Sequence, residues 1–298
     1  MKKFLIAAVS ALTIAASALS LTACGGDNKI YVDTNAFFAP FEYYGGTGGT
    51  EIVGVDIEIM NKVGEKLGKE VVFENTDFDV IIDNVASGKK YDCGAAGITI
   101  TDERKAKVDF SNPYFTTVQY AIFKNSEAVE TAVSTDGTST EHVLWSQLKG
   151  KKIGVQRDTT GDIFAADELS TYEKDDGSTF VGELYDADVA AIYSNAEAYS
   201  NAFLKKYDSA QLAVDAMGAD QIDVVIVDKL PAQYITLHNN NYKCYALYYD
   251  AETATTEDYA ICVTKGNNEL LNAINAVLAE LGENGINALV QKHLGLGE

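Results

Sequence analysis

Residues 94–115 read GAAGITITDERKAKVDFSNPYF and join a turn of small residues to a β-branched run and the start of a helix. At Ala96 and Gly97, backbone N–H groups can approach a ligand closely because no bulky side chain intervenes. The run Ile98–Thr101 alternates with a period of two, which predicts a strand with its two threonines on one face. The stretch therefore predicts a ligand-facing strand-to-helix turn.

Thr99 and Arg104 are the two side chains of this turn that suit a carboxylate. A hydroxyl donates one hydrogen bond, and a planar guanidinium can donate two in parallel. Together with free amides in the turn, they predict a carboxylate-binding site. An alternative interpretation is that Thr101 caps the helix and Arg104 pairs with a neighbouring acid on a solvated face.

The same stretch, continuing through Asp109–Tyr114 (DFSNPY), closely resembles a segment of the family 3 solute-binding proteins, the polar amino-acid-binding proteins of ABC importers. In that family the segment holds the ligand's α-carboxylate and leads into the hinge. Similar segments occur at four further places, so the resemblance covers most of residues 30–298. It implies an α/β, two-lobed periplasmic-binding-protein fold of type II, each lobe a mostly parallel sheet flanked by helices, joined by two crossing hinge strands. The implied boundaries are 30–117 and 258–298 for lobe 1, and 118–257 for lobe 2.

Periodicity and breaker residues predict the remaining elements. Apolar residues recur at helical spacing from Val55 to Leu67 and end at Gly68. The polar segment 126–141 reads as a loop, and we assign no function to 167–201. Further strands are expected at 30–33, 70–74, 118–124, 152–155, 224–228 and 259–263, and helices at 77–88, 231–238, 267–281 and 285–293.

Two aromatic residues and one amide are assigned to the pocket by the resemblance. Asn35 and Phe38 follow the first strand, and the carboxyl ends of strands in open α/β sheets are where ligands bind. The family places a ring against the ligand at Phe38, with Asn35 beside it, and a second aromatic wall at Phe78. The alternative is that the phenylalanines around Pro40 form a small hydrophobic plug.

Residues of the second lobe complete the implied site. Gln156 and Thr160 follow the strand at 152–155, where small polar residues at a helix start form an anion cradle. The resemblance makes Thr160 a carboxylate partner and Gln156 a side-chain contact. Asp228, at the carboxyl end of the strand at 224–228, is the acid that binds the ligand's α-ammonium in the family; it could instead cap the following helix.

The front of the chain reads as a lipoprotein signal. Residues 1–23 combine two lysines with an apolar run broken only by serine and threonine, which is typical of a secretory signal peptide. The ending Leu-Thr-Ala-Cys resembles a lipobox and implies cleavage before Cys24, acylation of Cys24 and a linker at 24–29. The alternative is an ordinary signal peptide with an incidental cysteine. The expected location is therefore the outer face of the cell membrane, or the periplasm, with the membrane reached through the lipid anchor.

The net charge and the cysteine content argue against several classes of function. The formal net charge of −21 becomes −23 when the two lysines of the signal peptide are removed. Such a charge argues against binding of nucleic acid. Cys93, Cys244 and Cys262 remain, and their spacing fits neither a metal site nor a disulfide framework. Pairing of Cys244 with Cys262 stays open, but three buried free thiols are expected.

A free amino acid carries a carboxylate and an ammonium on one carbon, and Arg104 and Asp228 offer it a cation and an anion from different lobes. We therefore expect a monomeric receptor, without cofactor, that closes on a polar L-amino acid and delivers it to the permease subunits of an ABC importer. Asn35, which replaces an acid found in some relatives, weakens the case for a cationic ligand; Asp158 would favour one if it pointed inward.

Two other functions stay open. A dehydratase of the cyclohexadienyl type shares this fold and needs a general acid in the cleft, but Asp228 is the sole acid among the matched positions. The three histidines, His142, His238 and His293, are expected in a polar loop and in helices, away from any nucleophile, so we expect no catalytic residues. A sensor module that binds an amino acid without transport is the other alternative.

Overall fold

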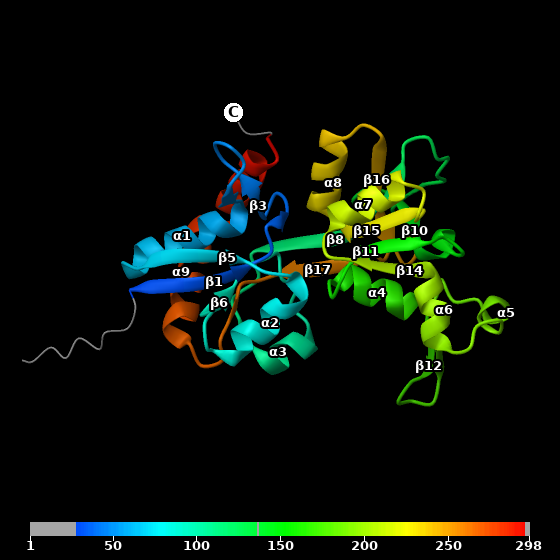
Figure 1. Cartoon of the computed structure of the whole chain (residues 1–298), viewed down its shortest axis with the longest axis horizontal. Helices are drawn as coiled ribbons and strands as arrows, with labels where there is room; N and C mark the ends of the chain where they lie inside the picture. Colours follow the sequence, from blue (N-terminus) through cyan, green and yellow to red (C-terminus); the bar gives the residue numbers. More distant parts are fainter. Residues whose placement is uncertain (1–27, 136, 296–298) are drawn as a thin grey trace, which may run out of the picture.

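A computed structural model describes residues 28–135 and 137–295, so the predicted signal peptide and Cys24 lie outside the described residues. The chain folds into two lobes, each with its own sheet and covering helices, and strands β8 and β17 run between them (Figure 1). This arrangement confirms the α/β, two-lobed fold class.

The first lobe contains a sheet in which the order of strands is β5-β1-β6-β18-β7. The pairs β1–β5 and β1–β6 are parallel, whereas β18 is antiparallel to β6 and β7. These strands are β1 (Lys29–Thr34), β5 (Glu70–Asn75), β6 (Cys93–Gly94), β7 (Asp109–Phe110) and β18 (Cys262–Val263), and a separate three-stranded sheet contains β2 (Phe37–Phe38), β3 (Glu42–Gly45) and β4 (Glu51–Val53).

The helices of the first lobe follow the predicted apolar spacing. Helix α1 buries Val55, Ile59 and Val63 and packs on α9, the last helix of the chain. The predicted helices at 267–281 and 285–293 are confirmed as the two helical segments of α9, separated by non-helical backbone at Gly282, where φ is 57°. The helices are α1 (Val55–Leu67), α2 (Phe78–Ser87), α3 (Asp102–Lys107) and α9 (Asn268–His293).

The second lobe contains a larger sheet with the order β14-β11-β15-β8-β16-β10-β9, and β17 pairs with β8. The pairs β11–β14, β11–β15 and β10–β16 are parallel. The crossing strand β8 is antiparallel to both of its neighbours, β15 and β16, and β9 is antiparallel to β10. Both sheets are thus mixed rather than mostly parallel. The strands are β8 (Phe115–Lys124), β9 (Ala132–Val133), β10 (Glu141–Leu144), β11 (Ile153–Gln156), β14 (Leu204–Tyr207), β15 (Val224–Asp228), β16 (Tyr242–Tyr248) and β17 (Thr256–Tyr259).

Helices cover both faces of this sheet, and Trp145 is fully buried in the core beneath it. The segment 167–201 forms a hairpin and two short helices that project from the far end of the lobe (Figure 1). The elements are the 3₁₀ helix η1 (Trp145–Leu148), α4 (Thr160–Glu168), β12 (Thr171–Glu173), β13 (Thr179–Val181), α5 (Ala187–Ala190), α6 (Ala196–Phe203), α7 (Ala210–Gly218) and α8 (Lys229–His238).

Three local expectations are corrected. Residues 98–101 form no strand; Thr99 makes a single bridge to Tyr259. His142, expected in a polar loop, is buried in β10. Of the three cysteines, all free thiols, Cys244 is only half-buried, and it lies in a different sheet from Cys262, which keeps the two apart.

None of the helices in the described ranges has the length and apolarity that a membrane crossing requires. Those ranges also contain no group of acidic, histidine and cysteine side chains arranged to hold a metal ion.

Candidate functional site

Side chains from both lobes meet between the carboxyl ends of β1 and β11. Gln156 Nε2, at the end of β11, donates to Asn35 Oδ1, just after β1, over 2.9 Å. Arg104 of the first lobe donates through one terminal nitrogen to the carbonyl oxygen of Asp158 in the second, over 3.0 Å. The candidate site is therefore a cleft across which the two lobes already touch.

Arg104 is held in this cleft by its own helix. Thr101 is the N-cap of α3, and its hydroxyl accepts a hydrogen bond from the Arg104 main-chain N–H, so the capping role foreseen for Thr101 is present. The guanidinium donates to Thr99 O over 2.8 Å and lies 5.4 Å from the centre of the Phe78 ring. Burial lowers the pKa of Arg104, but the group stays charged. Its two contacts to carbonyls use two of its five N–H groups and leave others to grip a carboxylate.

Asp228 is the acid of the opposite lobe. It occupies the N-cap position of α8, but its side chain makes no capping hydrogen bond, so the carboxylate is directed elsewhere. The side chain is buried, and Oδ1 has no well-aligned hydrogen-bond partner among the residues described. Burial, and next the charge of Glu257, raise the pKa of Asp228 well above its usual range, while the Tyr259 hydroxyl and Gln119 amide act in the opposite direction. A cation beside Asp228 would relieve both effects.

Glu257, on the crossing strand β17, is a site residue that the sequence did not reveal. Its Oε2 accepts hydrogen bonds from the hydroxyls of Thr99, over 2.8 Å, and of Thr160. Its Oε1 accepts from Gln119 Nε2 on β8 over 2.6 Å. The available signal was the period of two in a strand, which places Glu257 on the same face as Tyr259, two residues on; both are buried.

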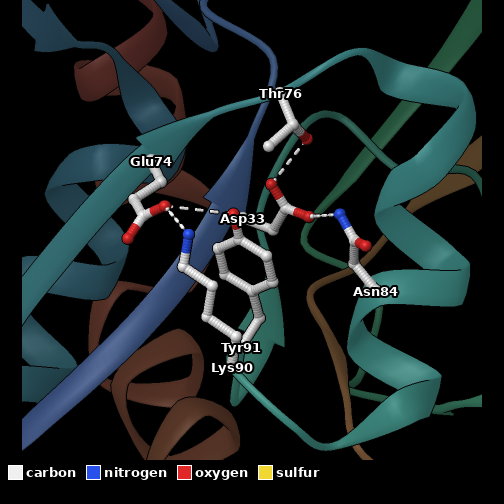
Figure 2. A network of polar contacts seen from close by, with 6 residues as sticks. All are labelled: Asp33, Glu74, Thr76, Asn84, Lys90 and Tyr91. Atoms are coloured by element: carbon white, nitrogen blue, oxygen red, sulfur yellow. Dashed lines mark hydrogen bonds and ion pairs between the residues drawn. The ribbon is translucent and has the colours of Figure 1, made fainter.

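A polar network around Asp33 in the first lobe (Figure 2) reaches Asn35 through Thr76. Asn35 contributes one contact to it. Its Nδ2 donates to the carbonyl oxygen of Thr76 over 2.7 Å, and the Thr76 hydroxyl donates to Asp33 Oδ1 over 2.7 Å. Asn84 Nδ2 donates to the other oxygen of Asp33 over 2.8 Å. Burial raises the pKa of Asp33 in spite of these donors. Both polar groups of Asn35 are thus engaged by the protein, one in each lobe.

Gly97 and Phe38 form one wall of the site. Gly97 has φ of 54°, and a Cβ there would lie 2.7 Å from Cε1 of Phe38, so the ring packs flat against a position that only glycine permits. The Gly97 N–H donates to Asp56 Oδ2 over 3.0 Å, which corrects the expectation of a free amide at this residue. Ala96, before it, is buried, and the Phe78 ring stands under Arg104 on the other side.

Glu42, at the start of β3, is a second acid that the sequence did not reveal. It is fully buried, and neither carboxyl oxygen has a hydrogen-bond partner in the described part of the chain. Burial, then the charges of Asp56 and Asp228, raise its pKa well above the usual range. Glu42, Asp56, Asp228 and Glu257 thus place four acids in the interior, whereas Asp158 is exposed and lines a cavity beside Arg104.

Cavities open on both sides of the contact between the lobes. One, of about 570 Å³, is lined by Phe78, Arg104, Asp158 and residues of α2, α3 and α4. The other, of about 250 Å³, lies between the hairpin β2–β3 and helices α7 and α8, with Tyr43 and Tyr234 in its wall.

Residues 30–296 match the bacterial extracellular solute-binding proteins, family 3. A probable histidine-binding protein of Neisseria gonorrhoeae is 27% identical and covers 96% of this chain and 92% of its own length. The L-arginine-binding protein of Pseudomonas aeruginosa is 27% identical, with coverages of 91% and 90%. An ancestral arginine-binding protein, solved bound to glutamine, has a TM-score of 0.65 and 30% identity, covering 91% of this chain and 99% of its own. The chain belongs to family 3 of the bacterial extracellular solute-binding proteins.

Proposed function

We propose that the protein is an extracytoplasmic receptor that binds a polar L-amino acid between its two lobes and delivers it to an ABC importer. One observation carries this proposal: a buried cation, Arg104, and a buried acid, Asp228, lie in the same cleft on opposite lobes. A buried charge needs a partner, and a zwitterion bound between them supplies both partners at once.

The contacts of the ligand are assigned to cleft groups that can still bind it: N–H donors for its carboxylate, an acid for its ammonium and two rings for its side chain. The α-carboxylate lies against Arg104 and the main-chain N–H of Thr160, in the first turn of α4, where helix N–H groups lack partners within the helix. The α-ammonium faces Asp228. The side chain lies between the Phe38 and Phe78 rings. The proposed ligand-binding residues are Asn35, Phe38, Phe78, Ala96, Gly97, Thr99, Arg104, Gln156, Thr160 and Asp228.

The ligand's side chain carries N–H donors rather than a carboxylate. Gln156 Oε1 is buried and, among the residues described, without a hydrogen-bond partner, so it can accept from an N–H group but not from a carboxylate. The Glu257 carboxylate also disfavours a second anion in the cleft. The named relatives bind histidine or arginine, and the ancestral protein was solved with glutamine. We therefore expect arginine, histidine or glutamine to bind and glutamate to be rejected.

The same proposal includes the processing of the chain, its anchoring to the membrane, its lobe boundaries and its partners. Residues 1–23 are removed, Cys24 is acylated, and residues 24–29 tether a monomer to the outer face of the membrane or within the periplasm. Lobe 1 takes residues 30–117 and 258–298, and lobe 2 takes 118–257. The partners are the permease subunits of the importer.

We assign the protein no catalytic role. Glu257 adds a second acid to the cleft, but three donors surround its carboxylate and favour the ionised form, which does not suit a general acid. Asp228 is needed for the ammonium.

A thermal-shift screen tests the proposed function. The chain lacking residues 1–24 is refolded to remove bound ligand and is tested with the twenty L-amino acids, keto acids and prephenate-like acids. A ligand at ~100 times its dissociation constant adds about 2.7 kcal/mol of stability. A shift with one or a few polar amino acids supports the receptor. A shift only with prephenate-like acids would point to the dehydratase instead.

A further inference from the structure

Glu257 lies where both lobes and both crossing strands meet. Its carboxylate comes from β17, Gln119 from β8, Thr99 from the first lobe and Thr160 from the second, and all four side chains are buried. All three neighbours donate to the carboxylate, Gln119 Nε2 over 2.6 Å and Thr99 Oγ1 over 2.8 Å. The acid is therefore the common acceptor of this part of the cleft.

The directions of these hydrogen bonds determine what the two threonines can offer a ligand. A hydroxyl has one proton and two lone pairs, and an ionised carboxylate accepts only. Thr99 and Thr160 both direct their protons to Glu257 Oε2, although their hydroxyl oxygens are also within 3.4 Å of each other. Each hydroxyl therefore turns lone pairs, not a proton, toward the rest of the cleft.

We propose that Glu257 is a positioning residue that sets the polarity of the site: by holding the hydroxyl protons of Thr99 and Thr160, it makes both oxygens acceptors for the ligand's α-ammonium. The proposal rests on the proposed function. Together with Asp228, these oxygens give the cleft acceptors for an ammonium, beside the N–H donors of Arg104 and of the first turn of α4. The hydroxyl of Thr99, expected from the sequence to donate to the carboxylate, then serves the ammonium.

The ionisation of the two acids agrees with this geometry. Burial raises the pKa of Glu257, but the Thr160, Gln119 and Thr99 hydrogen bonds and the Arg104 charge oppose it. Burial and the nearby Glu257 also raise the pKa of Asp228. The three donors around Glu257 favour its ionised form, and an ammonium bound beside Asp228 favours the ionised form of that acid.

The test compares a ligand with and without its ammonium. The probes are L-arginine and 5-guanidinopentanoic acid, which has the same side chain and carboxylate but no α-ammonium, and binding is measured by isothermal titration calorimetry. Thr99→Val keeps the shape and removes the hydroxyl. We expect it to weaken L-arginine binding by about 10-fold or more, as loss of a hydrogen bond to a charged group does, and to leave binding of the analogue within about 3-fold. Equal losses for both probes would overturn the proposal, because they would place the hydroxyl on the carboxylate.

Glu257→Leu tests the positioning residue itself. Leucine has no acceptor, so the hydroxyl protons of Thr99 and Thr160 are no longer held away from the cleft. We expect the preference for L-arginine over the analogue to fall about 10-fold. Asp258→Leu is the matched control, because it makes the same kind of change at the neighbouring exposed residue, whose carboxylate contacts Thr116. An unchanged preference in Glu257→Leu would contradict the proposal, and if that variant does not fold, Thr99→Val decides alone.

Binding by the unmutated protein distinguishes a failure of the proposed receptor function from a failure of the proposed role of Glu257. If it binds a different amino acid from the screen, that amino acid and its deaminated acid replace the probes. If it binds an amino acid but Thr99→Val weakens both probes equally, only the role of Glu257 fails. If it binds none of the twenty, the proposed function fails and the inference with it.

Discussion

Arg104 and Asp228 illustrate how single residues can be recognised as partners of a ligand. Each is buried with hydrogen-bonding capacity that the protein does not use: the guanidinium has N–H groups beyond its two carbonyl contacts, and Asp228 Oδ1 lacks a well-aligned partner in the described residues. Buried polar groups are normally satisfied, so those that are not indicate where a ligand belongs.

Arg104→Ala and Asp228→Ala should each weaken binding of the amino acid by ~100-fold or more, because truncating one partner of a buried charge pair costs on the order of 2 to 5 kcal/mol. Isothermal titration calorimetry with the amino acid found in the screen measures the effect. Arg157→Ala and Asp208→Ala are the controls, since these residues form an exposed ion pair of 3.3 Å near the cleft and should leave affinity unchanged. Near-normal binding by either cleft variant would remove that residue from the site.

Among the elements, the turn before α3 is shaped by its glycine. Residues 98–101 lack strand pairing beyond one bridge, and the positive φ of Gly97 directs the chain past the Phe38 ring. The cap at Thr101 then starts α3 and brings Arg104 into the cleft. The turn thus positions both an aromatic wall and the cation.

Gly97→Ala should lower both stability and affinity. Alanine at a positive φ costs about 1 to 2 kcal/mol, and the added Cβ must also displace the Phe38 ring, which it would approach to 2.7 Å. Gly68→Ala is the matched control: it has a similar φ of 65°, but a Cβ there has nothing within 4 Å. Gly68→Ala should lower the stability of the protein but leave its ligand affinity unchanged. Equal ligand affinity in the two variants, measured by calorimetry beside thermal melts, would mean that the Phe38 ring does not contact the ligand.

At the scale of the whole molecule, buried acids make stability depend on pH. Burial raises the pKa of Asp56 to about 6, against the hydrogen bonds that Gly97 and Tyr114 donate to it, and burial raises the pKa values of Asp33, Glu42 and Asp228 also. A carboxyl whose pKa is higher in the folded state binds more protons there, so its stabilising contribution is complete below the unfolded pKa and is lost as pH rises through the folded value.

The melting temperature should therefore fall as the pH rises from about 4 to 6 through the titration of Asp56, with further loss at higher pH from Glu42 and Asp228. For Asp56 alone, a rise from 3.8 to about 6 corresponds to roughly 3 kcal/mol above pH 6. Asp56→Asn should flatten part of this dependence, because it cannot ionise. Thermal melts followed by circular dichroism test this, and a melting temperature that rises over this range would contradict it. Below pH 4.5 the half-buried Glu74, whose pKa the hydrogen bond from Lys90 lowers, acts in the opposite direction.

Hinge closure is the second property of the whole molecule. The contacts between Gln156 and Asn35 and between Arg104 and Asp158 join the lobes directly, and the lobes cannot separate without breaking them. Ligand should therefore lower the radius of gyration measured by small-angle X-ray scattering, because it stabilises the closed form. Arg104→Ala should show no such contraction at the same ligand concentration. An unchanged radius in the unmutated protein would count against closure.

Local patterns in the sequence determined the elements. Helical spacing and a glycine stop predicted α1 with its αL cap at Gly68, and an apolar run ending in an acid predicted β15 and Asp228. These features depend on neighbours a few residues away, and so does the stretch 94–115 that identified the family.

Only the tertiary structure decided which polar groups are free. The Gly97 amide is taken by Asp56, 41 residues away, and the hydroxyls of Thr99 and Thr160 are taken by Glu257, 158 and 97 residues away. A sequence shows which donors and acceptors exist, but a buried proton is shared only between groups that folding brings within hydrogen-bond distance. The polarity of the cleft is therefore a property of the fold.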